Sequence, residues 1–515
     1  MKNKPTSIAD RAPARLAISA GRSGAIRSAA TYLTFALLLV AWVSQITGSG
    51  ATDDAEANVL MAVNLSHHGV ISQDVTPPHR PSMYREPLPA VVTAAYVALA
   101  DATLGRGAEQ SYLSGVRVRI LKYQNLVWMG LLSAIVLLSV RTFTASHFLG
   151  LAAAVLTSVS LPLIPSGLGL NGLRIDTLYS DLDAAVLLSG SSLLLSVGLR
   201  RRLRAVVGMA GVAFGLLVLT KAAYLYVFLG LVVTLPAFRV LTDPTGWRAI
   251  LGEMGVLSAA FAVVVIPWMY RNHHHFGEFQ ISERGGLILY TRAVKNSMTF
   301  EEYRASFYFW ARPSLRAPLR RVLGVASDDF LIGGPYQRLN RTGRSGFREE
   351  DVLAERSGRP EDAISFYSVA RAERVRLMNQ FERTGSANAL TEADATLQEQ
   401  ALRMIRDHPA KHLAMTVPFV WRGALIPFPV LLIGLAYSVW TRRTYLVAYV
   451  LPAFGAVTFH GLLTHYIPRY SVPMVPVCIV VIAGAAWWVV RWGVRRIRPN
   501  LAAASPSPVR EGEPQ

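Results

Sequence analysis

The sequence predicts an all-helical protein that crosses a membrane about ten or eleven times. Of its 515 residues, 52% are hydrophobic and only 17% are charged, whereas soluble domains carry roughly 25% charged residues. Apolar stretches long enough to cross a bilayer recur along the chain. Because backbone groups in lipid must bond within their own segment, helices are expected. The expected spans are 31–48, 86–104, 121–141, 147–165, 181–199, 205–220, 222–239, 250–270, 424–440, 444–463 and 470–491.

Basic clusters indicate how the chain is oriented. The net charge of +19 would suggest nucleic acid in a soluble protein, but here Arg and Lys collect in short loops, as cytoplasmic loops of membrane proteins do. The clusters at 200–204, 442–443 and 491–498 are therefore expected in the cytoplasm, together with both termini. Such a topology needs an even number of full spans. The stretch 86–104, which begins with two prolines, is the expected juxtamembrane or re-entrant element.

The polar and apolar regions divide the chain into five parts. One long polar segment is expected to be a mostly helical external cap, with a helix over 391–406 that Thr391 caps. The predicted parts are a basic cytoplasmic tail (1–30), an N-terminal transmembrane catalytic module (31–272) with an external loop (49–85), the cap (273–411), C-terminal transmembrane helices (412–498) and a disordered tail (499–515).

Acidic and basic side chains gather at the external ends of the expected spans. Acids in the first external loop are followed by a second acidic group that opens the 181–199 stretch. Cations come from four distant parts of the chain. The acids are Asp53, Asp54, Glu56 and Asp181, and the cations are Arg85, Lys221, Arg271 and Arg469.

This mixture suits transfer from a phosphate-linked donor. A carboxylate can take the proton from an acceptor hydroxyl, and cations can neutralise the leaving phosphate. Arg does so with two parallel hydrogen bonds and Lys as a point charge. No metal ligand set is expected, since the adjacent His273, His274 and His275 cannot all face one ion in a regular element. We therefore expect no cofactor and no metal.

Each feature also has a simpler explanation. Asp53 and Asp54 would offset the dipole of a helix that begins near residue 53. Lys221 would extend its ammonium group to the interface from a hairpin tip. Arg271 and Arg469 would serve as interface anchors, and acids near Asp181 would be solvated loop residues.

Several local patterns, in order along the chain, are similar to those of one enzyme superfamily. They are Asp53-Asp54 followed by Ala62-x-x-Leu65-x-x-x-Gly69, Arg85-Glu86-Pro87-Leu88-Pro89, Ser180-Asp181, the stretch from Gly215 to Lys221, Pro267-Trp268-x-x-Arg271-Asn272, and Arg469-Tyr470-x-x-Pro473-x-x-Pro476. Together they resemble the GT-C glycosyltransferases that use polyprenyl-phosphate sugars, of the protein O-mannosyltransferase, aminoarabinose transferase and Rgt types. The chain departs from the usual pattern, because the family often has Asp-Glu followed by an aromatic residue, whereas here Ala55 follows Asp54 and Asn58 takes the aromatic place.

The resemblance implies roles for individual residues. The general base falls on Asp54, with Asp53 as the alternate, because Ala55 displaces the pair by one position. Lys221, Arg271, Arg469 and Arg85 would bind the donor phosphate. The expected substrate-binding residues are Glu56, Asp181 and Tyr470.

The function expected is transfer of a hexose or pentose, with inversion and without metal, to a lipid, glycan or protein acceptor on the external or periplasmic face. The protein would lie in the cell's inner membrane among membrane lipids and bind no nucleic acid. The alternative is a transporter or lipid flippase. Transporters place ionisable groups near the middle of the membrane on broken helices, and the acids and cations here lie at external span ends. A membrane scaffold is a third possibility, which leaves the one-sided charges unexplained.

Overall fold

The computed structural model describes residues 12–160, 175–242, 246–343, 346–386 and 388–502. Within these ranges the chain is helical, and its one β-bridge joins Thr342 and Phe347. The helices are α1 (Ala12–Val43), α2 (Asp54–His68), α3 (Pro87–Leu104), η2 (Glu109–Tyr112), α4 (Gly115–Lys122), α5 (Gln124–Thr144), α6 (His147–Ser160), α7 (Asp181–Arg201), α8 (Arg204–Thr220), α9 (Tyr224–Thr242), α10 (Trp247–Phe276), α11 (Gly285–Ala293), η4 (Val294–Ser297), α12 (Phe300–Phe309), α13 (Pro313–Leu323), η5 (Ser327–Phe330), η6 (Gln337–Leu339), α14 (Glu349–Ser357), η7 (Pro360–Asp362), α15 (Phe366–Arg383), α16 (Ala389–Asp407), α17 (Pro409–Ala424), α18 (Pro427–Trp440), α19 (Thr444–Leu463), η8 (Pro468–Met474) and α20 (Val475–Ala502).

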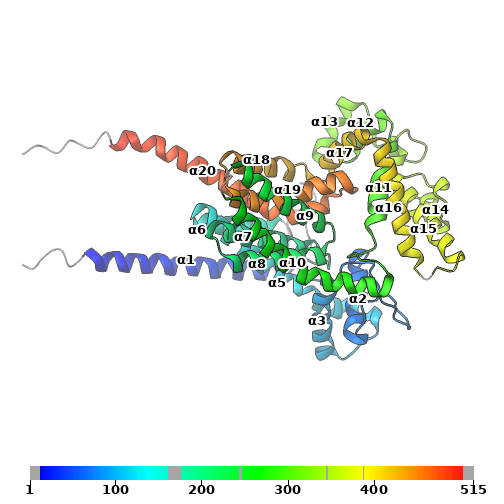
Figure 1. Ribbon diagram of the computed structural model, residues 1–515, viewed down its shortest axis with the longest axis horizontal. Coiled ribbons are helices and arrows are strands. Elements are labelled where there is room, and N and C mark those ends of the chain that lie inside the picture. Colours follow the sequence, from blue (N-terminus) through cyan, green and yellow to red (C-terminus); the bar gives the residue numbers. More distant parts are fainter. Residues whose placement is uncertain (1–11, 161–174, 243–245, 344–345, 387, 503–515) are drawn as a thin grey trace, which may run out of the picture.

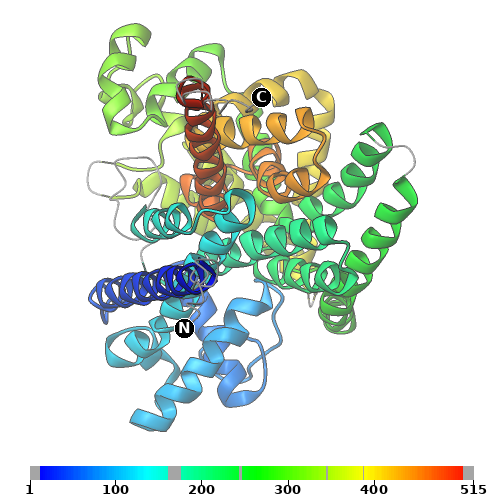
Figure 2. The same ribbon diagram turned by 90° about the vertical axis from the view of Figure 1, so that its left-hand side faces the viewer.

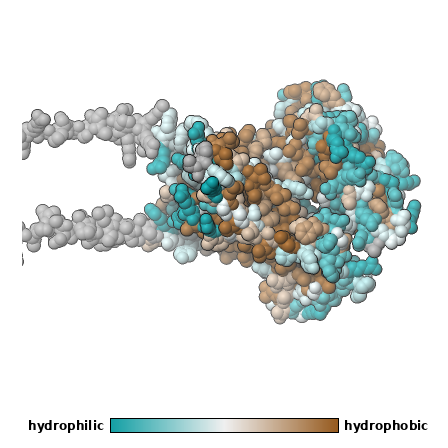
Figure 3. Space-filling model, viewed as in Figure 1, coloured by the Kyte–Doolittle hydropathy of each residue, from teal (hydrophilic) through white to brown (hydrophobic). Residues whose placement is uncertain are grey.

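Among the described residues, eight helical stretches are long and apolar enough to cross a membrane, or nine if the bent pair of α17 and α18 counts as one span. Two further apolar helices, α6 and α8, are shorter. On the face seen in Figure 3, hydrophobic residues cover the middle of the helical bundle, with more hydrophilic surfaces on either side. The protein is thus a multi-pass, all-helical membrane protein, as the sequence predicts.

The structure corrects several predicted boundaries. The span expected over 424–440 corresponds to α18, which begins at Pro427. The preceding helix, α17, ends at Ala424, and the chain bends by 102° between the two helices. Pro427 begins α18, and a proline lacks the N–H that a continuous helix would need there. The expected span 147–165 is helical to Ser160, and the remainder lies outside the described residues.

Both predicted tails are partly helical. Helix α1 begins at Ala12, well inside the tail predicted over 1–30, since this stretch is rich in the strong helix formers Ala and Arg. Helix α20 continues to Ala502, past residue 499, where we expected disorder to begin. Residues 1–11 and 503–515 lie outside the described residues.

The bundle has two distinct ends. Helices α1 and α20 extend from one end in the same direction (Figure 1), and Figure 2 looks onto that end. The basic turn after α7 lies at the start of α19, since the Arg200 guanidinium stacks 5.3 Å from the ring centroid of Tyr445. Helix α7 is 21 residues long, or about 30 Å. Its first residue, Asp181, therefore lies a bilayer thickness away from two of the basic clusters.

Two smaller groups of helices lie at the end of the bundle opposite to the one from which α1 and α20 extend (Figure 1). Helix α3 packs against α2 and α4, and the three share a hydrophobic core that is separate from the main core of the bundle. By length and composition α3 is nevertheless one of the eight helices that could cross a membrane, so the expectation that 86–104 is not a full span stays a prediction. Helices α11, α15 and α16 pack on one another to form the second group. The position of these groups outside the membrane remains a prediction.

One predicted helix start is wrong. The helix expected over 391–406 begins at Ala389, and its N-cap is Asn388. Thr391 is not the cap, because its hydroxyl lies inside the first turn and donates to Oε2 of Glu283 at 3.0 Å. A buried carboxylate from another segment competes for this hydroxyl, which no local sequence pattern reveals.

Candidate active site

Asp54 lies at the centre of a cluster of charged side chains. It is the first residue of α2, and three guanidinium groups from three distant segments reach its carboxylate. Arg85 Nη1 lies 2.5 Å from Asp54 Oδ1, Arg284 Nη1 lies 3.3 Å from the same oxygen, and Arg469 Nη2 lies 2.5 Å from Oδ2. The carboxylate thus joins the loop between α2 and α3, the start of α11 and the start of η8.

A second carboxylate extends the cluster into the bundle. Asp181, at the start of α7, has a side chain that is only 1% exposed. Lys221 Nζ lies 2.9 Å from its Oδ1, and Arg469 Nε lies 3.2 Å from its Oδ2. Arg469 therefore bridges the two acids, and Lys221 is held at the inner end of the cluster. We define the charged cluster as Asp54, Asp181, Arg85, Arg284, Arg469 and Lys221.

The surrounding elements fix these side chains in place. Glu86 Oε1 accepts a hydrogen bond from the backbone N–H of Ala222 at 2.9 Å, which ties the start of α3 to the turn that carries Lys221. Asp394 accepts bonds from the backbone N–H groups of Gly286 and Leu287, each at 2.8 Å. These bonds occupy two free donors of the first turn of α11 and so hold Arg284, which directly precedes it. A side chain at Gly286 would collide with the Asp394 backbone.

The charges in the cluster do not cancel. It contains four cations and two carboxylates, which leaves an excess of two positive charges. Burial alone would raise the pKa of Asp54, but Arg85, Arg284 and Arg469 outweigh burial and hold that pKa well below its usual range. The Nε atoms of Arg85 and Arg284 are buried and have no hydrogen-bond partner among the described residues. The cluster is therefore suited to receive an anion.

Further cations continue this positive region beyond Arg469. Burial lowers the pKa of His465 well below its usual range, and Lys295, Arg422, Arg284 and Arg469 lower it further. Burial also holds the pKa of Lys295 well below its usual value, with Arg422 and Arg292 acting in the same direction. His465 therefore links the charged cluster to a second set of cations from α11, η4 and α17.

The structure brings together most of the residues singled out from the sequence. Asp54, Asp181, Arg85, Arg469 and Lys221 belong to one network of ion pairs. Tyr470 lies beside it, since the Lys221 ammonium is 5.8 Å from the centroid of the Tyr470 ring.

Three of the predicted residues lie apart from these ion pairs. Arg271 Nη1 donates to the Ser82 carbonyl at 3.1 Å and to Asn272 Oδ1 at 2.8 Å, and its guanidinium lies over Trp268. Asp53 is exposed, has φ of 52°, and makes no side-chain hydrogen bond to cap α2. Glu56 is also exposed. Of the two adjacent acids, Asp54 is the one that faces the cations.

Sequence reasoning missed Arg284. It follows the motif Pro267-Trp268-x-x-Arg271-Asn272 and precedes Gly285-Gly286 in the polar segment. The sequence signal was an arginine beside two glycines at a helix start, which occurs in many loops. Its role depends on the packing of α11 against α16.

Glu283, next to Arg284, is a buried acid. It is 7% exposed. Burial raises its pKa to about 7 and Asp394 adds to this rise, while the Thr391 hydrogen bond and Arg374 act in the opposite direction. Between its ordinary pKa of 4.5 and about 7, the folded protein holds a proton that the unfolded chain releases. The contribution of Glu283 to stability is therefore greatest below pH 4.5, falls as the pH rises to about 7, and is constant above it.

Glu283→Gln should remove the loss of stability that Glu283 causes between pH 4.5 and about 7. We expect the variant to match the parent protein at pH 4.5 and to exceed it at pH 8, by about 3 kcal/mol if the whole difference in pKa is expressed. Thermal unfolding in detergent at the two pH values measures the effect. Glu278→Gln, at an exposed position, is the matched control and should change neither melting temperature. An equal effect of Glu283→Gln at both pH values would contradict the prediction.

The chain was compared with known proteins at three levels. No protein-family model and no curated protein matches it. Two crystal structures of ArnT from Cupriavidus metallidurans match, one in the apo state and one bound to undecaprenyl phosphate, each with 14% sequence identity and a TM-score of 0.35. Each match covers 87% of this chain, and 77% and 78% of the two ArnT chains.

Proposed function

We propose that this protein is a membrane glycosyltransferase that moves a sugar from a polyprenyl-phosphate donor to an acceptor. The observation that carries the proposal is the carboxylate of Asp54 under three arginines, at the end of the bundle opposite the basic turns. A polyprenyl tail stays in lipid and holds its phosphate at the level of the headgroups. A cluster with excess positive charge at the level of the headgroups would lie at the same depth as that phosphate and could bind it directly.

Asp54 occupies the arginine donors that a phosphate would use. Arg presents paired N–H groups that fit phosphate and carboxylate oxygens equally well. We infer that the donor phosphate displaces the Asp54 carboxylate from one or more of Arg85, Arg284 and Arg469. Lys221 remains paired with Asp181, which keeps its charge directed toward the cluster.

This exchange would convert Asp54 into a competent base. A carboxylate whose pKa is held far below its usual range takes up a proton poorly. Once the arginines turn to the phosphate, the pKa of Asp54 rises, and its oxygen can accept the proton of the acceptor hydroxyl. The acceptor oxygen then bonds to the anomeric carbon as the bond between that carbon and the phosphate oxygen breaks. The arginines and Lys221 receive the charge that develops on the phosphate.

This displacement occurs in one step from the side opposite the phosphate, so we propose inversion at the anomeric carbon. Asp53 is the alternate base, and Arg271 is a further donor-binding residue from the loop side. Asp181, Tyr470 and Glu56 are proposed to line the substrate path. The sugar is a hexose or pentose, the acceptor is a lipid, glycan or protein, and the enzyme acts at the external face of the inner membrane.

Product analysis tests the function directly. Membranes containing the protein would be supplied with radiolabelled polyprenyl-phosphate sugars, and label would be followed into lipid, glycan and protein fractions. We expect transfer with the parent protein and none with Asp54→Asn. Movement of the labelled lipid between leaflets without any new sugar linkage would instead favour the flippase alternative.

We propose that the transfer needs no metal, because the four cations of the cluster supply the neutralising charge. Turnover should continue in excess chelator, measured as the initial rate of sugar transfer. A rate lost to chelator and restored by magnesium or manganese would overturn the metal-free mechanism, since those ions would then be stabilising the leaving phosphate.

A further inference from the structure

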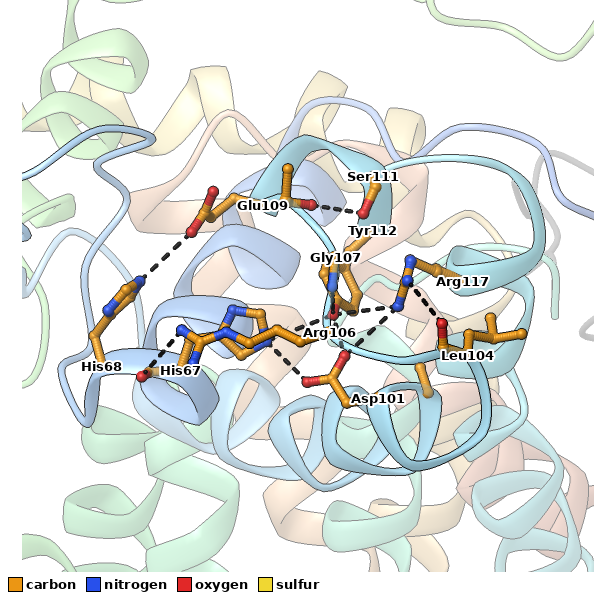
Figure 4. A network of polar contacts seen from close by, with 12 residues as sticks. His67, His68, Asp101, Leu104, Arg106, Gly107, Glu109, Ser111, Tyr112 and Arg117 are labelled. Carbon is orange, nitrogen blue, oxygen red and sulfur yellow. Dashed lines mark hydrogen bonds and ion pairs between the residues drawn. The ribbon is translucent and has the colours of Figure 1, made fainter.

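A second polar cluster lies at the opposite end of α2 from Asp54. His67 and His68, the last two residues of α2, face Glu109 of η2 (Figure 4). The 15 residues of α2 place this cluster about 20 Å from the first residue of the helix. Nothing in the proposed transfer reaction uses these side chains.

The three residues offer ligand atoms that converge. One ligand atom from each of His67, His68 and Glu109 lies within 4.8 Å of the other two, and His68 Nε2 is 3.5 Å from Glu109 Oε1. Ligand atoms around a tetrahedral zinc ion lie roughly 3.3 Å apart, given bonds of about 2.0–2.1 Å. Small rotations of exposed side chains would close the remaining gap.

The hydrogen bonding of His67 leaves one of its ring nitrogens available to bind a metal ion. Its side chain is only 3% exposed, and its Nε2 lies 2.9 Å from Asp101 Oδ2. A carboxylate at one ring nitrogen sets the tautomer and leaves the lone pair of the other nitrogen free, as behind many zinc-bound histidines. The other nitrogen, Nδ1, is buried and has no hydrogen-bond partner among the described residues. A buried acceptor without a donor is costly, and a bound cation would satisfy it.

The groups around the cluster hold Asp101 in its contact with the His67 ring. Tyr112 donates its hydroxyl to Asp101 Oδ1, and Arg117 Nη1 lies 3.6 Å from the same oxygen. Asp101 is thus engaged on both oxygens, which leaves Glu109 to supply the anionic ligand. The ring of His79 stacks on His68 with 4.0 Å between centroids, which fixes the plane of the exposed histidine.

We propose that His67, His68 and Glu109 bind one zinc ion that fastens the end of α2 to the loop after α3. Two imidazole nitrogens and one carboxylate oxygen form a ligand set that zinc accepts, with water in the fourth position. The ion would hold the far end of the helix that begins with Asp54 and so limit its motion. No pattern in the sequence indicates this site, because the third ligand comes from η2, 41 positions after His68, and only the fold brings it to the two histidines.

Metal content is the first test. The full-length protein would be purified in detergent, dialysed against chelator, then equilibrated with Zn²⁺ alone, and bound zinc counted by mass spectrometry of the elements. We expect one zinc per chain, and at least about a tenfold loss of affinity in His68→Ala and in Glu109→Gln. The matched control replaces His273, His274 and His275, a second group of exposed histidines, with alanine, and should still bind one zinc.

A second test examines how the ion is bound. Co²⁺ in place of zinc should give the visible absorption of a four-coordinate site, and Asp101→Asn should weaken binding about tenfold or more without removing a ligand. Zinc should also raise the melting temperature of the parent protein but not that of His68→Ala. No stoichiometric zinc, or zinc lost only in the control variant, would overturn the proposal. None of these readouts measures sugar transfer, so their failure would leave the proposed function untouched.

Discussion

Asp54→Asn should reduce sugar transfer by about a thousandfold while polyprenyl phosphate binds as well as before or more tightly. A positioned general base contributes roughly 10²–10⁴ in rate, and asparagine cannot accept the proton. The effect on binding follows from the ion pairs, because Asp54 occupies Arg85, Arg284 and Arg469 in the ligand-free protein. Asparagine keeps the shape of the side chain but releases these arginines for the phosphate.

Two measurements separate the effects. Initial rates of transfer give the loss in turnover, and equilibrium binding of undecaprenyl phosphate to the purified protein gives the change in affinity. Asp53→Asn is the matched control: Asp53 is exposed, so we expect near-normal turnover. A near-normal rate in stably folded Asp54→Asn, or an equal loss in both variants, would rule out Asp54 as the base.

Arg469→Gln should lower kcat/KM by roughly 10²–10³, the usual cost of losing one donor to a developing oxyanion, and should weaken donor binding. Arg469 is the only described residue that forms ion pairs with both Asp54 and Asp181. Arg271→Gln is the comparison, since Arg271 bonds to Ser82 and Asn272 and lies outside the ion pairs. We expect Arg271→Gln to cost less than about tenfold, because Arg271 would contact the donor only from the loop side while Ser82 and Asn272 hold its guanidinium.

Loss of Arg469 also leaves Asp181 with Lys221 as its ion-pair partner, and breaking a buried pair costs about 3–5 kcal/mol. The double variant Arg469→Gln with Asp181→Asn removes both charges but leaves Lys221 without its ion-pair partner, so it should recover only part of the lost melting temperature. Its turnover should stay low, because the phosphate still lacks Arg469. If the double variant regained turnover together with stability, the role of Arg469 would be structural and the donor-binding proposal would fail for this residue.

The sequence by itself determined the membrane class, the approximate spans and the residues at their ends. These properties are local, because a run of apolar side chains is enough to predict a helix in lipid. The orientation that the basic loops indicate stays a prediction. The same local view placed Asp54, Asp181, Arg85, Lys221 and Arg469 at one face, where the structure joins them.

Only the tertiary structure decided which of these charges meet. Arg469 is 415 positions from Asp54 along the chain, and Arg284 reaches the same carboxylate because α11 is held by Asp394 from α16. The choice between Asp53 and Asp54 depends on the entry of the chain into α2, and Arg271 is drawn away by a carbonyl of the first external loop. Ion pairs in a low-dielectric site depend on distances between segments, and hydropathy along a single chain carries no information about those distances.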